Sequence, residues 1–157
     1  MAVVSHYFPE FEIQGFTKTV NLSSDTLNVG LIASGTFTWG STPEGYTFVS
    51  SFLAGDGTHG ALTEVSTSST GYSRQALVSP TLTASGEVIT LTCSTNPSWP
   101  SATFSTVYGF LYDSSVGSGD SSHPIICYWD FGGLQSVSSA TFTLTINGSG
   151  LVTWTAS

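Results

Sequence analysis

Strict alternation of apolar and polar residues recurs along this chain and predicts half-buried β-strands, whose side chains point in turn to the core and to solvent. Turn signals such as Ser85–Gly86 and Asn147–Gly148 separate the alternating stretches. No long amphipathic helical pattern lies between them, which disfavours a parallel sheet. The predicted strands of this kind are Thr26–Ile32, Gly71–Leu77, Val88–Cys93, Ala140–Ile146 and Leu151–Thr155.

Two further runs, Val107–Tyr112 and Pro124–Phe131, are apolar and aromatic on both faces instead of alternating. Both have the length of a strand, and a flexible polar loop that contains glycine joins them. A strand that is apolar on both faces is usually covered on both faces. We therefore predict that these two runs are the central strands of a sheet buried between layers.

The remaining segments have weaker patterns. Residues 33–60 are punctuated by glycines and predict an ordered surface excursion, in which Tyr46–Leu53 could add a short edge strand. Asn96–Pro100 is predicted to be a turn that carries Trp99.

Residues 1–20 form an unusual aromatic segment, with Pro9 at a plausible first helical position and Gly15 as a stop. It is either one short helix that caps a sheet edge or an arm whose aromatic residues dock on a neighbouring subunit. Its candidate partner-binding residues are Tyr7, Phe8, Phe11 and Phe16.

These patterns predict a single domain over residues 1–157, with residues 1–20 as its aromatic cap or arm. The fold class is all-β, an antiparallel β-sandwich of immunoglobulin-like or jelly-roll-like type. It has about seven to nine strands and at most one short helix, near the N-terminus.

Composition supports this fold class and excludes some classes of binding partner. Ser and Thr supply 50 of the 157 residues, and only 8% of residues are charged. The net charge is −8, and Lys18 and Arg74 are the only Lys or Arg residues. Two cations cannot form the basic patch that binds phosphates or anionic lipids, so we expect no nucleic-acid partner and no membrane attachment.

The chain shows no signal-peptide pattern and no apolar run long enough for a membrane span, so we expect synthesis in the cytosol. Cys93 and Cys127 could pair if adjacent strands bring them together. Two unpaired thiols are the better expectation, because cytosolic proteins are usually reduced.

No catalytic motif is present, and we expect no enzymatic activity, no cofactor and no metal. The histidines His6, His59 and His123 are scattered. The loop from Asp113 to Asp120 contains carboxylates and carbonyls that could coordinate calcium. It has fewer acidic residues than a known calcium loop, so a solvated hairpin is favoured.

Four tryptophans raise the alternative of a carbohydrate-binding module. Trp129 and Trp154 lie in strand-like runs and are assigned to the core. Trp39 and Trp99 lie beside Gly and Pro and are the candidates for a sugar-stacking platform.

Arg74 is the one charged residue that we single out. It lies within a strand-like run beside Tyr72, and its guanidinium can hold a carboxylate bidentately. We predict a structural ion pair, with Glu64 and Asp130 as candidate partners.

An ordered set of stretches resembles a family of small virion structural proteins of tailed bacteriophages. The stretches are SSDTLNVGLI at 23–32, GYSRQAL at 71–77, VYGFLYD at 107–113, HPIICYWDFGG at 123–133 and TFTLTINGSGLV at 141–152. The aromatic N-terminus and the 33–60 excursion depart from the family pattern.

The resemblance implies a β-sandwich without enzymatic activity that is located in the virion. Its partners would be the major capsid protein and copies of itself, in an oligomer such as a trimer that decorates the phage head. A phage tail component is the nearest alternative, and a carbohydrate-binding module at the virion surface is the alternative of another class.

Overall fold

The computed structural model describes residues 4–8, 15, 19–37, 45–55, 57–146 and 150–155, and strands account for about half of them. The strands are β1 Val4–Tyr7, β2 Leu27–Ser34, β3 Thr63–Glu64, β4 Gln75–Ala76, β5 Thr81–Ser85, β6 Val88–Thr92, β7 Ser98–Asp113, β8 Ile125–Thr143 and β9 Val152–Thr155. A short helix, α2, spans Val49–Leu53. No helix among these residues is long and apolar enough to cross a bilayer.

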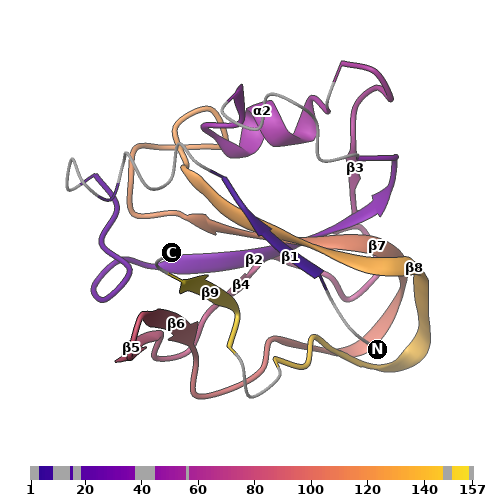
Figure 1. Ribbon diagram of the computed structural model, residues 1–157. Coiled ribbons are helices and arrows are strands. Elements are labelled where there is room, and N and C mark those ends of the chain that lie inside the picture. Colours follow the sequence, from indigo (N-terminus) through magenta and orange to yellow (C-terminus); the bar gives the residue numbers. More distant parts are fainter. Residues whose placement is uncertain are drawn as a thin grey trace.

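The described elements form three layers (Figure 1). The middle layer is a sheet in the order β1-β8-β7-β2-β3, and β4 pairs with the same edge of β2 as β3 does, further along the strand. Helix α2 lies on one side of this sheet, and a three-stranded sheet in the order β5-β6-β9 lies on the other. All strand pairs are antiparallel, so the predicted all-β antiparallel class is confirmed.

The prediction of a central strand pair buried on both faces is confirmed. Strands β7 and β8 pair in the middle of the large sheet, with Phe110 opposite Tyr128 and Leu111 opposite Cys127. Phe110 and Tyr128 belong to the hydrophobic cluster shared with α2. Leu111 belongs to a second cluster, shared with the small sheet through Leu91.

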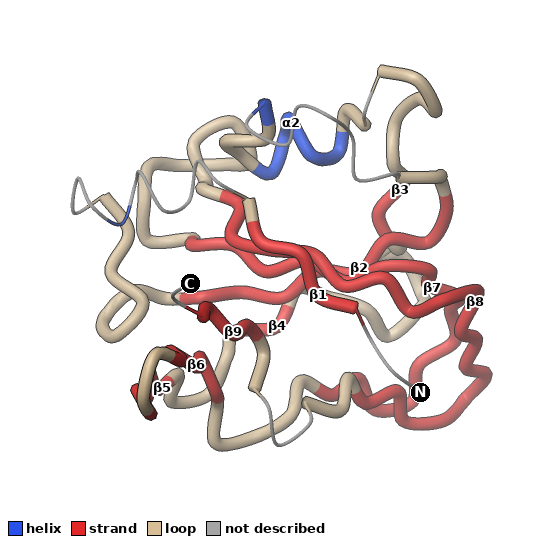
Figure 2. Tube along the Cα trace, viewed as in Figure 1, coloured by secondary structure: helices blue, strands red, loops and turns tan. Residues whose placement is uncertain are grey.

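Strands β7 and β8 extend well beyond this buried centre. The predicted turn at 96–100 is wrong, because β7 already begins at Ser98, and Ala140–Ile146 is no separate strand, because β8 runs on to Thr143. The pairing shifts register at several points of this extension, which lets the two strands bend together without ending (Figure 2). Bulges of this kind leave little trace in an alternation pattern.

The N-terminal segment begins with a strand that was not predicted, whereas the predicted helix from Pro9 to Gly15 falls almost wholly outside the described residues. Residues 4–7 form edge strand β1, which pairs with β8, and the Phe8 side chain is fully buried. A strand at this edge and a core phenylalanine are therefore integral to the fold. Residues 9–14 and 16–18 lie outside the described residues.

The 33–60 excursion also differs from its prediction. Its described part supplies α2 where a short edge strand was expected, and Phe48 makes only an isolated bridge to Pro124. Val49 and Phe52 of α2 are fully buried against the sheet. The helix forms here because these two residues, three apart, share one face that the sheet can cover.

Gly30 of β2 shows how closely the side chains on the α2 side of the large sheet pack against its backbone. It lies opposite Phe110, and a Cβ atom at Gly30 would come within 2.2 Å of the Phe110 ring. The ring is fully buried and also lies close to the Phe52 and Tyr112 rings. The absence of a side chain at position 30 is therefore what lets the ring lie across β2.

We predict that Gly30→Ala lowers the free energy of unfolding by about 2–3 kcal/mol, because the added methyl group overpacks the Phe110 site. The measurement is the urea midpoint of the purified protein. Gly45→Ala is the matched control, since a Cβ there would have no atom within 4 Å. Equal midpoints for the two variants would contradict this account of the packing.

Candidate functional site

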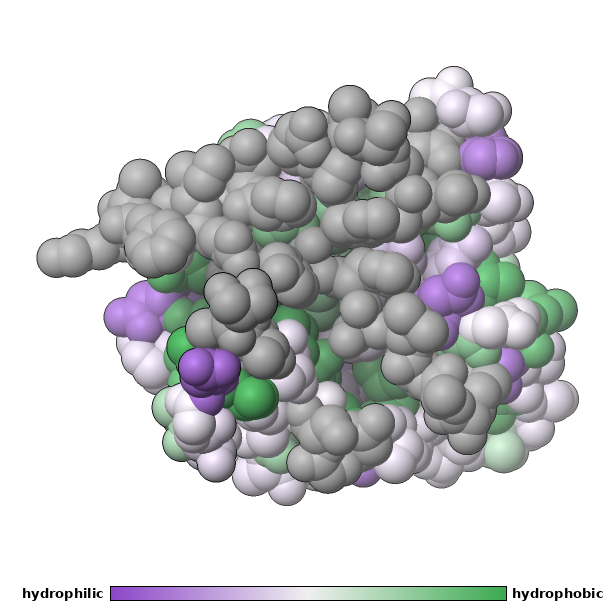
Figure 3. All heavy atoms as spheres, viewed as in Figure 1, coloured by the Kyte–Doolittle hydropathy of each residue, from purple (hydrophilic) through white to green (hydrophobic). Residues whose placement is uncertain are grey.

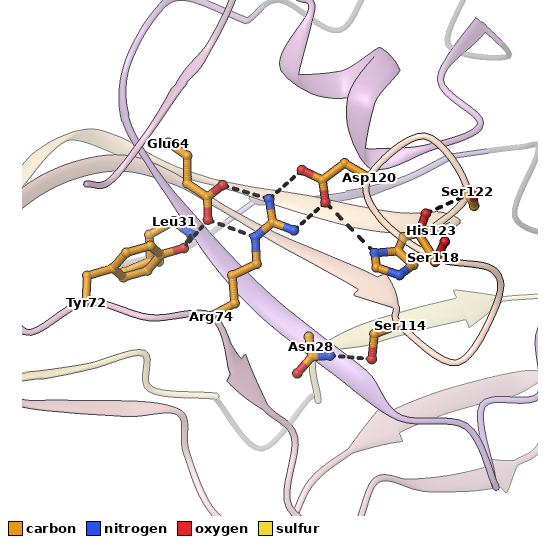
Figure 4. A network of polar contacts seen from close by, with 10 residues as sticks. All are labelled: Asn28, Leu31, Glu64, Tyr72, Arg74, Ser114, Ser118, Asp120, Ser122 and His123. Carbon is orange, nitrogen blue, oxygen red and sulfur yellow. Dashed lines mark hydrogen bonds and ion pairs between the residues drawn. The ribbon is translucent and has the colours of Figure 1, made fainter. Parts of the chain in front are cut away.

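The most densely bonded polar cluster of the described residues surrounds Arg74 (Figure 4). The Arg74 guanidinium holds Glu64 through Nε and Nη2, at 2.8 and 2.7 Å. It holds Asp120 through Nη1 and Nη2, at 2.6 and 2.8 Å. Both carboxylates are thus bound in the bidentate geometry that suits a guanidinium.

The cluster sits where the edge of β2 changes partner. Strand β4 pairs with residues 28 and 29 of β2, and β3 pairs with residues 32 and 34. Between them the Leu31 N–H donates to the Tyr72 hydroxyl at 2.9 Å, and that hydroxyl donates to Glu64 at 2.7 Å. A side chain therefore completes the sheet edge where the ladder is interrupted, so that no buried amide is left without a partner.

Aromatic rings form the floor beneath the guanidinium. Its central carbon lies 5.4 Å from the Phe110 ring centroid and 5.0 Å from that of Tyr112. At these distances the rings attract the cation and shield it from water on that side. The Arg74 side chain is 22% exposed, which places the ion pairs between a surface and a buried environment.

The pKa shifts follow from this geometry. Burial alone would lower the pKa of Arg74, but the hydrogen bonds to Glu64 and Asp120 outweigh it and raise that pKa. The hydrogen bonds from Arg74 also lower the pKa of Asp120, against the effect of burial. Burial and the charge of Glu64 raise the pKa of Tyr72, so its hydroxyl keeps its proton. All three groups are held in their ordinary charge states at neutral pH.

This cluster is suited to fastening segments and offers no obvious reactive group. Its two carboxylates accept hydrogen bonds from Arg74 or Tyr72, and the guanidinium directs its donors at them. It joins β3, the segment before β4 and the loop between β7 and β8 over the face of the sheet. The predicted structural role of Arg74 and its pairing with Glu64 agree with this geometry.

The second predicted partner, Asp130, is wrong. Asp120 takes that place, because the β7–β8 loop folds back over Arg74. Asp130 lies in β8 opposite Tyr108, and its carboxylate accepts from the Gly132 N–H at 2.8 Å. Nothing in the sequence distinguishes Asp120 as the partner, since the path of an 11-residue polar loop is fixed only by the folded structure.

His123 adjoins the cluster without being bound into it. Its ring stacks on Tyr112, and its Nδ1 lies 3.9 Å from Asp120 and has no hydrogen-bond partner. His59 is exposed elsewhere, and the side chain of His6 lies outside the described part. Within that part, no group of three or more His, Cys, Asp or Glu side chains could hold a metal ion.

The predicted aromatic contact residues fare differently from one another. Trp99 is fully buried in β7, stacks on Tyr72 and donates to the Ser73 carbonyl at 2.6 Å, so the sugar-stacking platform is wrong for it. Phe8 is a core residue and cannot serve as an exposed contact. Trp129 is buried as predicted. The positions of Phe11, Phe16 and Trp39 and the side chains of Tyr7 and Trp154 lie outside the described part.

Both cysteines are free thiols, in agreement with the expectation of unpaired cysteines. Cys127 is fully buried, and this burial raises its pKa well above the usual range. Burial also raises the pKa of Cys93, so neither thiol is activated as a nucleophile.

A second acidic site was missed in the sequence, where Asp113 was assigned to a solvated loop. Asp113 is fully buried at the end of β7, and its Oδ1 accepts from the Ser115 N–H at 2.7 Å. Its Oδ2 is buried without any hydrogen-bond donor. Asp25, just before β2, is in side-chain contact with Asp113. Burial is the main cause that raises the pKa of Asp113, to about 6, and the neighbouring Asp25 carboxylate adds to this effect.

Comparisons with protein-family models, curated proteins and solved structures gave no match for this chain. The resemblance to phage structural proteins therefore remains a prediction.

We predict that Arg74→Ala lowers the free energy of unfolding by about 2–4 kcal/mol, because it leaves two partly buried carboxylates close together without their cation. Arg74→Lys should recover only part of this loss, since an ammonium cannot hold two carboxylates bidentately. Thermal unfolding measures both effects. Gln75→Ala is the control, because that side chain bonds only Ser73 at the surface; a melting temperature for Arg74→Ala equal to the control's would refute the fastening role.

We further predict that Asp113 makes stability fall as pH rises. The pKa of Asp113 is near 6 in the folded protein and about 3.9 when unfolded. The unfolded chain thus releases its proton first, and stability declines between about pH 4 and 6 before levelling off. Below this window the lowered pKa of Asp120 acts in the opposite direction.

Asp113→Asn should remove that decline and raise the free energy of unfolding at pH 7 by about 1–3 kcal/mol, because its amide can donate to Asp25. Urea titrations across the pH range, in buffer with a chelator, provide the measurement. Asp130→Asn is the control, because the wild-type Asp130 carboxylate only accepts from the Gly132 N–H. This variant should keep the wild-type dependence of stability on pH. An unchanged slope for Asp113→Asn would show that this carboxyl is not the group responsible.

Proposed function

We propose that this chain is a structural protein of a tailed bacteriophage virion, without catalytic activity, that decorates the capsid as an oligomer. The resemblance of its ordered sequence stretches to that protein family suggests the setting. The structural observation that carries the proposal is the β5–β6 hairpin, which presents an assembly surface.

One face of the hairpin is apolar, and this face is buried at one end and exposed to solvent at the other. Leu82 lies opposite Leu91, and Ala84 lies opposite Ile89, so these four side chains share one face of the small sheet. Leu91 is fully buried, whereas Leu82 is 38% and Ile89 47% exposed. An apolar sheet face that extends beyond its own core is a feature of surfaces that associate.

The outer edge of the hairpin is also open. All five residues of β5 are exposed, and among the described strands only β6 pairs with it. Its sequence, TLTAS, has no charge and no proline, so it lacks two of the features that usually keep an edge strand from pairing. Another strand can therefore add to this edge through main-chain hydrogen bonds.

The occupant that fits this edge is the same hairpin of a second copy of the chain. Two β5 strands can pair antiparallel about a twofold axis, in which each copy offers the same surface. The uncharged strand allows this in spite of the net charge of −8, which otherwise repels like copies. The described residues on the face shown in Figure 3 are mostly pale or green, with few strongly hydrophilic ones.

The arrangement of the ionisable groups supports a passive role. The charged residues that converge around Arg74 bind one another and serve to fasten the fold. Attachment to a shell would then come from many modest contacts, which an oligomer multiplies on a repeated lattice.

We predict that Leu82→Lys combined with Ile89→Lys shifts the protein toward monomer, because it places like charges on the associating face. Sedimentation velocity over a range of concentrations measures the change. Leu134→Lys is the matched control, since Leu134 is 62% exposed on the β7–β8 extension. A wild-type chain that stays monomeric, or an equal effect of the control, would count against this surface.

The virion setting is tested with phage heads that lack this protein. Wild-type protein should bind them and the double variant should bind at least about tenfold less, if each of several linked contacts is weakened. Density at the tail in electron microscopy of the complete particle would favour a tail component instead. Deletion of the N-terminus is unsuitable here, because β1 and Phe8 belong to the fold.

A further inference from the structure

The Asp25–Asp113 pair lacks a neutralising partner among the described residues. Asp113 is fully buried, and its Oδ2 has no donor. Asp25 faces it, and the Asp25 carboxylate accepts from the Asn21 N–H and from the Ser24 hydroxyl. None of these donors carries a positive charge, so a buried and a half-buried carboxylate meet without a cation from the described residues beside them.

The Lys and Arg residues cannot supply one within the described part of the chain. Arg74 is bound to Glu64 and Asp120, and Lys18 lies outside that part. Two ionised carboxylates in contact repel each other strongly away from bulk water. Within the described part of the chain, only a proton or a metal cation can therefore neutralise the pair.

We propose that Asp25 and Asp113 bind a divalent cation, with calcium as the ion that fits best. The groups at the pair that could coordinate a cation are carboxylate and hydroxyl oxygen atoms, which suit a hard cation. Calcium accepts irregular sets of carboxylates, hydroxyls and water, whereas Mg²⁺ requires a near-ideal octahedron. Asp25 is only half-buried, which leaves room for water to complete the coordination shell.

The site ties together two segments that are distant in sequence. The Thr26 N–H donates to the Ser115 hydroxyl at 2.6 Å, and the Ser114 hydroxyl donates to the Thr26 carbonyl at 2.9 Å. These bonds hold the entry to β2 against the end of β7, where the two acids meet. A cation between the acids would add a charged link at the same junction and would stabilise the folded protein.

The test is the melting temperature of the full chain, first stripped with a chelator and then titrated with CaCl₂ up to about 10 mM, a range that covers weak protein calcium sites. At about ten times the Kd, wild type should gain roughly 3–6 °C. MgCl₂ and NaCl at matched ionic strength should give clearly smaller shifts. Calorimetric titration should show one calcium ion per chain.

Asp113→Asn and Asp25→Asn should each abolish the calcium shift. Glu87→Gln, in the exposed turn of the β5–β6 hairpin, should keep it. Asp113→Asn is expected to be at least as stable as wild type without calcium, so a lost response would not reflect misfolding. No calcium-specific shift in wild type would show that the pair holds a proton, and a shift retained in Asp113→Asn would place any bound ion elsewhere; either result would overturn the proposal.

Discussion

The burial of both faces of the β7–β8 pair is the constraint on which the rest of this structure depends. A sheet whose two faces are apolar must be covered twice, and the chain supplies two different covers. One is α2 with its aromatic neighbours, and the other is the small sheet β5-β6-β9. The position of each outer element follows from this requirement, including that of the β7–β8 loop, which reaches back over the sheet to Arg74.

Scarcity of positive charge is the second condition that shapes the molecule. With Lys18 and Arg74 as its only Lys and Arg residues, the chain cannot neutralise its acids by ordinary salt bridges. Arg74 is shared between Glu64 and Asp120, and Asp113 is left facing Asp25. The same scarcity of charged residues leaves the abundant Ser and Thr hydroxyl groups to supply much of the polar surface.

The sequence predicted those parts of the fold that depend on local patterns. The run at 107–112 was recognisable because apolar residues on both faces have one common explanation, and Arg74 stood out because a lone cation in a strand needs a partner. Asp120, α2 and the burial of Trp99 could not be predicted, because each depends on where a distant segment comes to lie. Asp113 was missed because a polar loop follows it in the sequence, whereas its neighbours in space are the core and Asp25.

The pairing of β1 with β8 has a consequence for how the chain is made. Val4 pairs with Asp130, so the first strand has no partner until more than a hundred further residues have been synthesised. At synthesis rates of about 5–20 residues per second this delay lasts on the order of 6–25 s. During that time β1 has no strand to pair with, and Phe8 stays exposed to contacts with other unfinished chains.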